Sequence, residues 1–212
     1  LLNEQIDGTF PAHHPDPTVP ENLQQLMDRG RADSCDLGIA FAGAADRIGI
    51  VDGYSEILSG HPILALLGRP VLPTQPGATI IADVKASQLL FDEVARLGGS
   101  PLMWMTGHSL IKAKMAETGA PLAGEMSGHI FFKERWYGFD DGVYVAARLC
   151  ELLSAQNQTP TAVFNSIPEL VSTPELRLEM EEGEHHALVE QFVRNARFPT
   201  GEICTIDGIR VD

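Results

Sequence analysis

The 212-residue sequence predicts an α/β fold built on mixed, mainly parallel sheets. Short apolar runs typical of buried strands alternate with segments whose apolar residues recur at helical spacing, and this alternation is typical of parallel sheets covered by helices. Hydrophobic residues make up 44% and charged residues 21% of the chain, so a sizeable core can be buried. A disordered tail, a collagen-like fibre and a coiled coil are therefore excluded.

The first part of the chain is expected to contain a loop, a helix and a pair of strands. Four prolines make the stretch 7–20 unsuitable for a helix or a central strand. Residues 21–31 carry leucines and a methionine at helical spacing, and Gly30 is the expected end of this helix. Apolar strands are predicted over 35–41 and 48–51, separated by a turn of very small residues.

The second part repeats the alternation of strands and helices. Asp140 or Asp141 is expected at the N-cap of the longest helix, where a carboxylate is favourable. The apolar run 62–72 is interrupted by Gly68 and Pro70, and we predict neither a helix nor a strand for it. It is far shorter than the roughly 20 residues that a membrane helix needs. The predicted strands cover 78–84, 102–105, 120–125 and 129–133, and the predicted helices cover 87–97, 109–117 and 140–154.

Charge and cysteine content limit the partners and the compartment. The net charge is −14, from 15 Lys and Arg against 29 Asp and Glu, which disfavours nucleic acid as a partner. Cys35, Cys150 and Cys204 are too scattered for a disulfide framework or a zinc motif, so a reducing cytoplasm is expected. No signal peptide or membrane segment is predicted, and the start at Leu1 suggests a piece of a longer chain.

The composition changes near the end of the chain. Glutamates are concentrated after Pro168, which predicts a domain boundary there.

Two strand ends carry polar side chains that could take part in chemistry. Asp46 and Arg47 follow the first predicted strand, although a surface ion pair explains them as well. His108 follows Gly107 at a predicted helix start, where backbone N–H groups favour anions. A helix cap by Ser109 beside a solvated histidine is the alternative interpretation.

A third polar loop, residues 124–129, carries Glu125, Ser127 and His129 at alternate positions. In an extended segment this spacing places all three side chains on one side. A structural turn does not require three different hydrogen-bonding side chains, whereas a carboxylate beside a hydroxyl suits the vicinal hydroxyls of a sugar. Lys85, at the end of another strand, either adds a cation to the same site or is simply solvated.

Taken together, these segments resemble the α-D-phosphohexomutases, and within that family its bacterial branch with both phosphomannomutase and phosphoglucomutase activity. The resemblance covers nearly the whole chain, and GEMSGH following TGH is its most specific feature. The matching motifs are DGTFPAHHPDP at 7–17, DLGIAF and ADRIGIVD within 36–52, DVK at 83–85, TGHSLIKAKM at 106–115 and GEMSGHIFFKERWYGFDDG at 124–142.

The resemblance implies a division into units of a four-domain enzyme, with three related three-layer α/β domains and a smaller α+β domain. Residues 1–56 would form the later part of domain 2, residues 57–168 domain 3, and residues 169–212 the beginning of domain 4. Domain 1, which carries the phosphoserine, is expected to lie outside this chain. The family also implies a monomeric, cytoplasmic enzyme when full length.

The reaction implied by the resemblance moves a phosphoryl group between the 1- and 6-oxygens of mannose or glucose phosphates. A phosphoserine donates to give a hexose 1,6-bisphosphate, which turns around before the serine is phosphorylated again. Glu125 and Ser127 would bind the sugar 3- and 4-hydroxyls, and Arg47 would lie beside the phosphoserine. The further residues of this pocket would be Lys85, Gly107, His108 and His129, of which His108, with Arg47, is a catalytic candidate.

The chain departs from the family in the loop that binds Mg²⁺. Family members have DGD(G/A)DR, whereas Ala42 and Ala44 stand here in place of two carboxylate ligands and leave only Asp46. Because Mg²⁺ demands near-octahedral oxygen coordination, this loop is expected to bind it poorly and mutase activity is expected to be impaired. The alternative function is a catalytically inactive phosphosugar-binding module or partner subunit.

Overall fold

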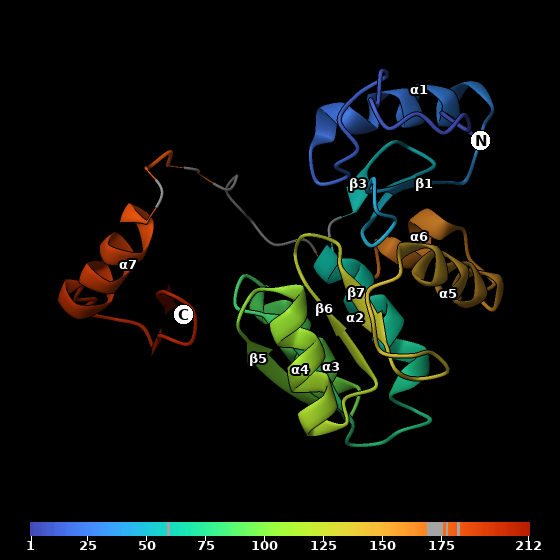
Figure 1. The fold of residues 1–212 in the computed structure, drawn as a ribbon. Helices are drawn as coiled ribbons and strands as arrows, with labels where there is room; N and C mark the ends of the chain where they lie inside the picture. The colour runs from blue at the N-terminus through green and yellow to red at the C-terminus, as the bar shows by residue number, and fades with distance from the viewer. Residues whose placement is uncertain (59, 169–175, 177, 182) are drawn as a thin grey trace.

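The computed structural model describes residues 1–58, 60–168, 176, 178–181 and 183–212 (Figure 1). After the loop that precedes residue 20, a 3₁₀ turn (η1, Pro20–Leu23) leads into helix α1 (Gln24–Ala32). The helix predicted over residues 21–31 is present from Gln24, and it ends at Ala32 rather than at Gly30. The helix continues for one more half-turn, and Arg29 pairs with Asp33 at its end at 2.6 Å.

The first sheet has the order β1-β2-β3, with strands β1 (Leu37–Phe41), β2 (Ile48–Asp52) and β3 (Ile57–Leu58). Both strand pairs are antiparallel. The link between β1 and β2 is residues 42–47, which is too short for the crossover that parallel neighbours require. The mainly parallel character predicted for the chain therefore does not extend to this sheet.

The second sheet has the order β5-β4-β6-β7 and is mixed and mainly parallel, as predicted (Figure 1). Strand β4 (Thr79–Asp83) pairs in parallel with β5 (Ser100–Trp104) and with β6 (Leu122–Gly124). Strand β7 (Ile130–Phe132) closes an antiparallel hairpin with β6. The carboxyl ends of β4, β5 and β6 consequently lie at the same edge of the sheet.

Helices cover both faces of this sheet and make three layers. One face packs on helices α2 (Gly60–Val71), α3 (Gln88–Arg96) and α5 (Gly142–Ser154), and helix α6 (Pro160–Phe164) adds Val163 and Phe164 to the same apolar cluster. The other face packs on helix α4 (His108–Thr118), through Ile111 and Met115. Strand β4 alternates between the two cores, since Ile80 and Ala82 belong to one and Ile81 to the other.

Helix α2 was not predicted. Its proline and glycine residues suggest a break, but Pro62 lies in the first turn, where a missing N–H is tolerated, and Pro70 lies near the carboxyl end. Nearly every residue of α2 is buried because the sheet, α3 and α5 surround it. A mostly apolar run of this kind cannot be assigned to a helix from the spacing of its residues alone.

The C-terminal part of the chain consists of helix α7 (Glu184–Asn195) and a hairpin of β8 (Ile203–Cys204) and β9 (Arg210–Val211). It lies on the β5 side of the second sheet (Figure 1). The boundary predicted just after Pro168 falls on residues outside the described ranges. Across the described ranges, no helix combines the length and apolar character needed to cross a membrane.

Candidate functional site

The predicted polar loops meet at the edge formed by the carboxyl ends of β4, β5 and β6, which is where open parallel sheets place ligand sites. We call residues 42–47 the metal loop, because they occupy the position of the family's metal-binding motif. We call residues 124–129 the sugar loop. Backbone contacts join the two loops. Ile48 N–H donates to the carbonyl of Gly128 at 3.1 Å, and Arg47 forms an isolated β-bridge with His129.

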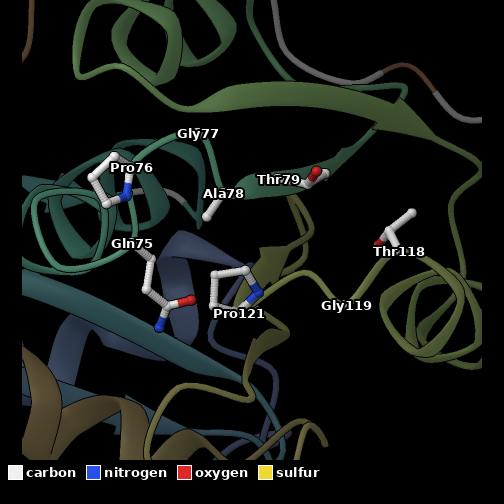
Figure 2. A pocket seen from close by; sticks show the side chains of 8 residues that line it. All are labelled: Gln75, Pro76, Gly77, Ala78, Thr79, Thr118, Gly119 and Pro121. Atoms are coloured by element: carbon white, nitrogen blue, oxygen red, sulfur yellow. The ribbon is translucent and has the colours of Figure 1, made fainter.

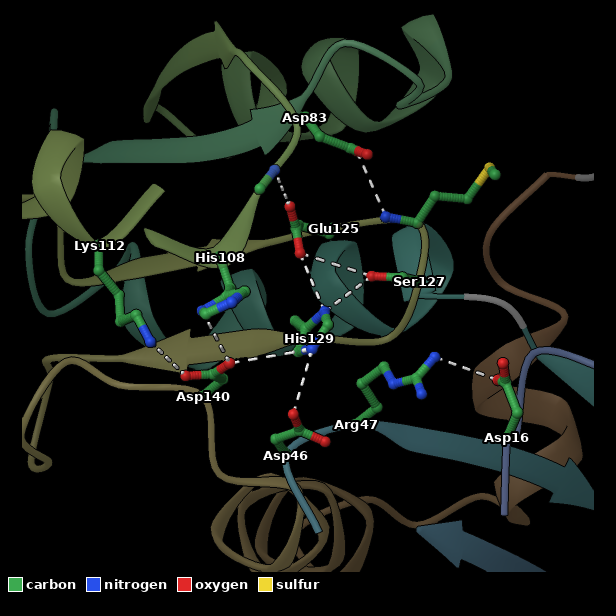
Figure 3. Close-up of polar contacts among 12 residues, drawn as sticks. Asp16, Asp46, Arg47, Asp83, His108, Lys112, Glu125, Ser127, His129 and Asp140 are labelled. Carbon is green, nitrogen blue, oxygen red and sulfur yellow. Dashed lines mark hydrogen bonds and ion pairs between the residues drawn. The ribbon is translucent and has the colours of Figure 1, made fainter. Parts of the chain in front are cut away.

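The sugar loop brings together the three side chains that were predicted to converge (Figure 3). The Nδ1 of His129 lies 3.0 Å from Oε2 of Glu125 and 2.9 Å from Oγ of Ser127. Oε1 of Glu125 accepts from the N–H of Gly107 at 2.6 Å. The predicted reason for the convergence is wrong, since the segment is the connection of the β6–β7 hairpin and not an extended strand. Gly128 allows this turn with φ +90°.

Glu125 is the buried carboxylate of the site, with a side chain 3% exposed. Burial alone raises its pKa. Hydrogen bonds from His129 and from the N–H of Gly107, together with the positive charges of His129 and His108 when protonated, outweigh burial and hold the pKa of Glu125 below its ordinary value. The carboxylate is therefore ionised at neutral pH and its oxygens act only as acceptors.

His108 begins helix α4 directly after Gly107, which has φ +132° at the N-cap. Its ring centroid is 5.8 Å from that of His129, and Asp140 approaches both rings from one side (Figure 3). One oxygen of Asp140 is 4.0 Å from Nδ1 of His108 and 3.9 Å from Nε2 of His129, and the other accepts from Lys112 Nζ at 2.9 Å. His108 and His129 thus share an acidic neighbour.

Sequence reasoning missed Asp140 and Lys112 as members of the site. Asp140 was considered only as a helix cap, but Asp141 provides that cap by accepting from the N–H of Tyr144. Lys112 follows His108 by four residues, so the two lie on the same face of α4, and this spacing could have found it.

The metal loop places its two charged residues differently. Asp46 lies 3.5 Å from Nε2 of His129, so it faces the sugar loop. Arg47 instead pairs with Asp16 of the N-terminal loop at 3.2 Å. Burial raises the pKa of Asp16, but hydrogen bonds from Thr18 and the charge of Arg47 prevail and lower it. Lys85 is exposed in the turn that follows β4.

The residues at the metal loop do not fit Mg²⁺. Ala42 is buried and offers no oxygen ligand from its side chain, and Ala44 lacks one as well. Asp46, His129 and Asp140 each have a potential ligand atom within 4.8 Å of the others. One of the three atoms is an imidazole nitrogen, and Asp140 is already paired with Lys112, whereas Mg²⁺ prefers an octahedron of oxygens.

A buried pair of side chains, Asp83 and His61, holds the sugar loop in place. Asp83, at the end of β4, is fully buried, and its Oδ1 lies 2.9 Å from Nε2 of His61 and accepts from the N–H of Met126 at 3.3 Å. Neighbouring Gly60 packs so closely that a Cβ on it would lie 2.4 Å from the carbonyl oxygen of Glu125. The first turn of α2, which was not predicted, therefore fixes the backbone of this loop.

The opposite edge of the sheet is hollowed, and its chemistry differs from that of the polar loops. A cavity of about 380 Å³ lies at the amino end of β4 (Figure 2). None of its lining residues is charged at neutral pH. They are Gln75, Pro76, Gly77, Ala78, Thr79, Thr118, Gly119 and Pro121. The polar loops at the carboxyl edge remain the candidate functional site.

The three-layer sheet with polar loops at its carboxyl edge is the architecture of an α/β/α phosphohexomutase unit. Family models confirm this class: "Phosphoglucomutase/phosphomannomutase, alpha/beta/alpha domain III" matches residues 59–171 and domain II of the same family matches residues 1–55. The chain belongs to the phosphoglucomutase/phosphomannomutase family.

Individual relatives agree with the family models. The chain is 50% identical over 208 residues to a phosphomannomutase/phosphoglucomutase of Pseudomonas aeruginosa, and 48% identical over 209 residues to a phosphoglucomutase of Neisseria meningitidis. These alignments cover 98% of this chain and 45% of each relative. A crystal structure of a family member from Burkholderia thailandensis superposes with a TM-score of 0.91 at 50% identity, covering 98% of this chain and 44% of that one. The chain thus spans about half the length of the relatives it matches.

Proposed function

We propose that this chain is the sugar-recognition part of a phosphohexomutase that interconverts hexose 1-phosphate and hexose 6-phosphate, with mannose or glucose as the sugar. The observation that carries the proposal is the convergence of Glu125, Ser127 and His129 beside His108, at the sheet edge where such folds bind ligands. Membership of the family and 50% identity to the Pseudomonas enzyme support the same function. The reaction proceeds through a phosphoserine and a hexose 1,6-bisphosphate, and the phosphoserine lies outside the loops described above.

The proposed division of labour follows from the charges and donors of the loops. Ionised Glu125 accepts hydrogen bonds from two neighbouring sugar hydroxyls, and Ser127 both donates and accepts. The 3- and 4-hydroxyls exchange places when the sugar turns around, so one acceptor site serves both orientations. Lys85, Arg47 and His108 offset the charge of the phosphoryl groups.

A second candidate function, a phosphosugar-binding module without catalysis, is favoured by one observation. The metal loop provides a single carboxylate, Asp46, and that carboxylate faces His129. Mg²⁺, when bound in a phosphoryl-transfer site, neutralises charge on the transferring group. A protein that lacks this contribution can still bind a phosphosugar through the sugar loop.

Binding is tested by NMR titration of this chain with glucose 1-phosphate and glucose 6-phosphate, with glucose and inorganic phosphate as separate controls. We expect amide shifts in the sugar loop and at Gly107, and loss of binding in Glu125→Gln. Glu117→Gln is the matched control, since Glu117 is a 67%-exposed carboxylate at the far end of α4. Absence of binding, or equal binding by Glu125→Gln, overturns the proposal.

Catalysis is tested separately with a chimera in which this chain replaces the matched 45% of the Pseudomonas enzyme. Conversion of glucose 1-phosphate to glucose 6-phosphate by the chimera supports the mutase. Phosphosugar binding without turnover supports the binding module instead.

A further inference from the structure

The C-terminal hairpin of β8 and β9 contacts loops of the candidate site that lie about one hundred residues earlier in the chain. The loop between β8 and β9 carries Asp207, and β9 begins with Arg210. Asp207 reaches the loop after β5, and Arg210 reaches the turn after β4. These are the two segments that present His108 and Lys85.

Asp207 binds the backbone directly before the start of α4. Its Oδ2 accepts from the N–H of Thr106 at 2.9 Å. The next amide, Gly107 N–H, donates to Glu125 of the sugar loop at 2.6 Å. Two consecutive amides are therefore held by carboxylates from two different parts of the chain, and together they fix where His108 begins the helix.

Arg210 binds the turn that contains Lys85. Its Nη1 donates to the carbonyl of Val84 at 3.0 Å and to that of Ala86 at 2.5 Å, so the guanidinium holds the residues on both sides of Lys85. Asp212 orients the same guanidinium through contacts of 2.6 to 2.9 Å. The Arg210 side chain is 13% exposed, and hydrogen bonds from a charged donor in such surroundings are stronger than neutral ones.

We propose that Asp207 and Arg210 are positioning residues for phosphosugar binding: they hold the two strand-end loops in the conformation that presents His108 and Lys85 to the ligand. The physical reason is preorganisation, because loops already fixed lose less conformational freedom when the ligand binds. The inference rests on the proposed function and adds that the site depends on the C-terminal hairpin.

The test uses the full 212-residue chain and four variants. Asp207→Ala and Arg210→Ala remove the contacts, whereas Asp207→Asn keeps an oxygen acceptor for the N–H of Thr106. Arg194→Ala is the matched control, since Arg194 forms an exposed ion pair with Glu190 on α7 of the same C-terminal part. Amide hydrogen exchange reports on the loops without ligand, and NMR titration with glucose 6-phosphate reports on binding.

We expect the amide of Thr106 to exchange about tenfold faster in Asp207→Ala, while amides of the buried strand β4 stay unchanged. The dissociation constant for glucose 6-phosphate is expected to rise about tenfold in Asp207→Ala and in Arg210→Ala, and about twofold or less in Asp207→Asn and Arg194→Ala. Binding by the wild type with unchanged affinity in both alanine variants overturns this inference alone. Failure of the wild type to bind overturns the proposed function as well.

Discussion

The metal loop and the sugar loop have the same structural role but opposite side-chain chemistry. Each connects an antiparallel strand pair, β1–β2 for residues 42–47 and β6–β7 for residues 124–129. The sugar loop carries a buried carboxylate, a hydroxyl and an imidazole in mutual contact. The metal loop is reduced to small residues followed by Asp46 and Arg47.

Backbone contacts, and not the family's carboxylates, hold this edge together. The carbonyl of Ala45 accepts from the N–H of Gly142 at 2.8 Å, and Ile48 N–H donates to Gly128. Both contacts are made although residues 42 and 44 are alanine. The sugar loop is therefore held in place without carboxylates at residues 42 and 44, so the proposed sugar binding can be tested apart from the proposed catalysis.

The largest expected effect comes from Gly60→Ala, which tests how firmly the sugar loop is held. The added Cβ would lie 2.4 Å from the carbonyl oxygen of Glu125, and this backbone atom cannot move without displacing the loop. We expect the free energy of unfolding to fall by about 3 kcal/mol. Urea denaturation followed by circular dichroism measures it.

Gly43→Ala is the matched substitution on the metal loop. Its Cβ would meet side-chain atoms of Pro15 and Phe10 at 2.9 and 3.1 Å, and Phe10 is 45% exposed and free to shift. The expected loss is about 1 kcal/mol or less. Equal losses at the two positions would contradict the view that the sugar loop is the more rigidly built of the two.

The next effect concerns two of the acidic residues around His129, one from each loop. Glu125→Ala leaves the N–H of Gly107 without its acceptor and removes the carboxylate beside the imidazole of His129, in a site where Glu125 is 3% exposed. We expect a loss of about 2 kcal/mol in stability and at least a tenfold loss in glucose 6-phosphate affinity. Calorimetry and NMR titration measure these two quantities.

Asp46→Ala provides the comparison from the metal loop. Asp46 is 34% exposed and 3.5 Å from His129, so its removal is expected to change stability by about 0.5 kcal/mol and phosphosugar affinity by less than threefold. If Asp46→Ala lowered phosphosugar affinity more than Glu125→Ala does, the metal loop and not the sugar loop would be the main binding element.

The double substitution Ala42→Asp, Ala44→Asp tests whether the missing carboxylates explain the poor fit to Mg²⁺. Both would join Asp46 on one short loop, where three carboxylates repel one another until a cation neutralises them. We expect a lower melting temperature without metal and a gain of several degrees on adding Mg²⁺, which the wild type does not show. Thermal unfolding with and without Mg²⁺ measures the difference.

Ala42→Asn, Ala44→Asn is the control, because the amide side chains have the same shape without the charge. If Mg²⁺ raises the melting temperature of this variant as much as that of the aspartate variant, the rise does not come from restored carboxylate ligands. The ligand assignment carried over from the family would then be wrong.

Much of the second sheet and of the sugar loop could be predicted from the sequence, because strand and helix periodicities are strong there and the polar residues cluster. Helix α2 could not, because a nearly continuous apolar run that contains Gly68 and Pro70 cannot be told from other buried segments by the spacing of its residues. The antiparallel course of β1 and β2 depends on the length of one short link, which the alternation of strands and helices does not reveal.

The candidate site was predicted in part, for a physical reason. Glu125, Ser127 and His129 are neighbours in the chain, so their meeting needs only one turn. Asp140 precedes α5 outside the sugar loop, and Arg210 reaches the turn after β4 from 126 residues further along the chain, so the spacing of residues carries no signal for these contacts.

The smallest expected effect is a change in the pH dependence of stability. The pKa of Glu125 in the folded chain lies below its ordinary value of 4.5, so the unfolded state binds more protons in mildly acidic solution. The stability that Glu125 contributes is therefore present above pH 4.5 and is lost as the pH falls through the folded pKa. Glu125→Gln removes the titrating group, so the fall in unfolding free energy below that pH becomes shallower. Urea denaturation at a series of pH values measures the slope.

Asp16→Asn is the counterpart on the side of the metal loop. Its carboxylate is 20% exposed and paired with Arg47, and its pKa is also lowered, chiefly by hydrogen bonds from Thr18 that outweigh burial. Asp16→Asn is also expected to make the fall in unfolding free energy at acid pH shallower. Because the Asp16 carboxylate is more exposed and solvent screens its interactions, this change is expected to be smaller than for Glu125→Gln. Identical acid limbs for the wild type and Glu125→Gln would contradict an ionised, hydrogen-bonded Glu125. They would also remove the main electrostatic difference between the two loops.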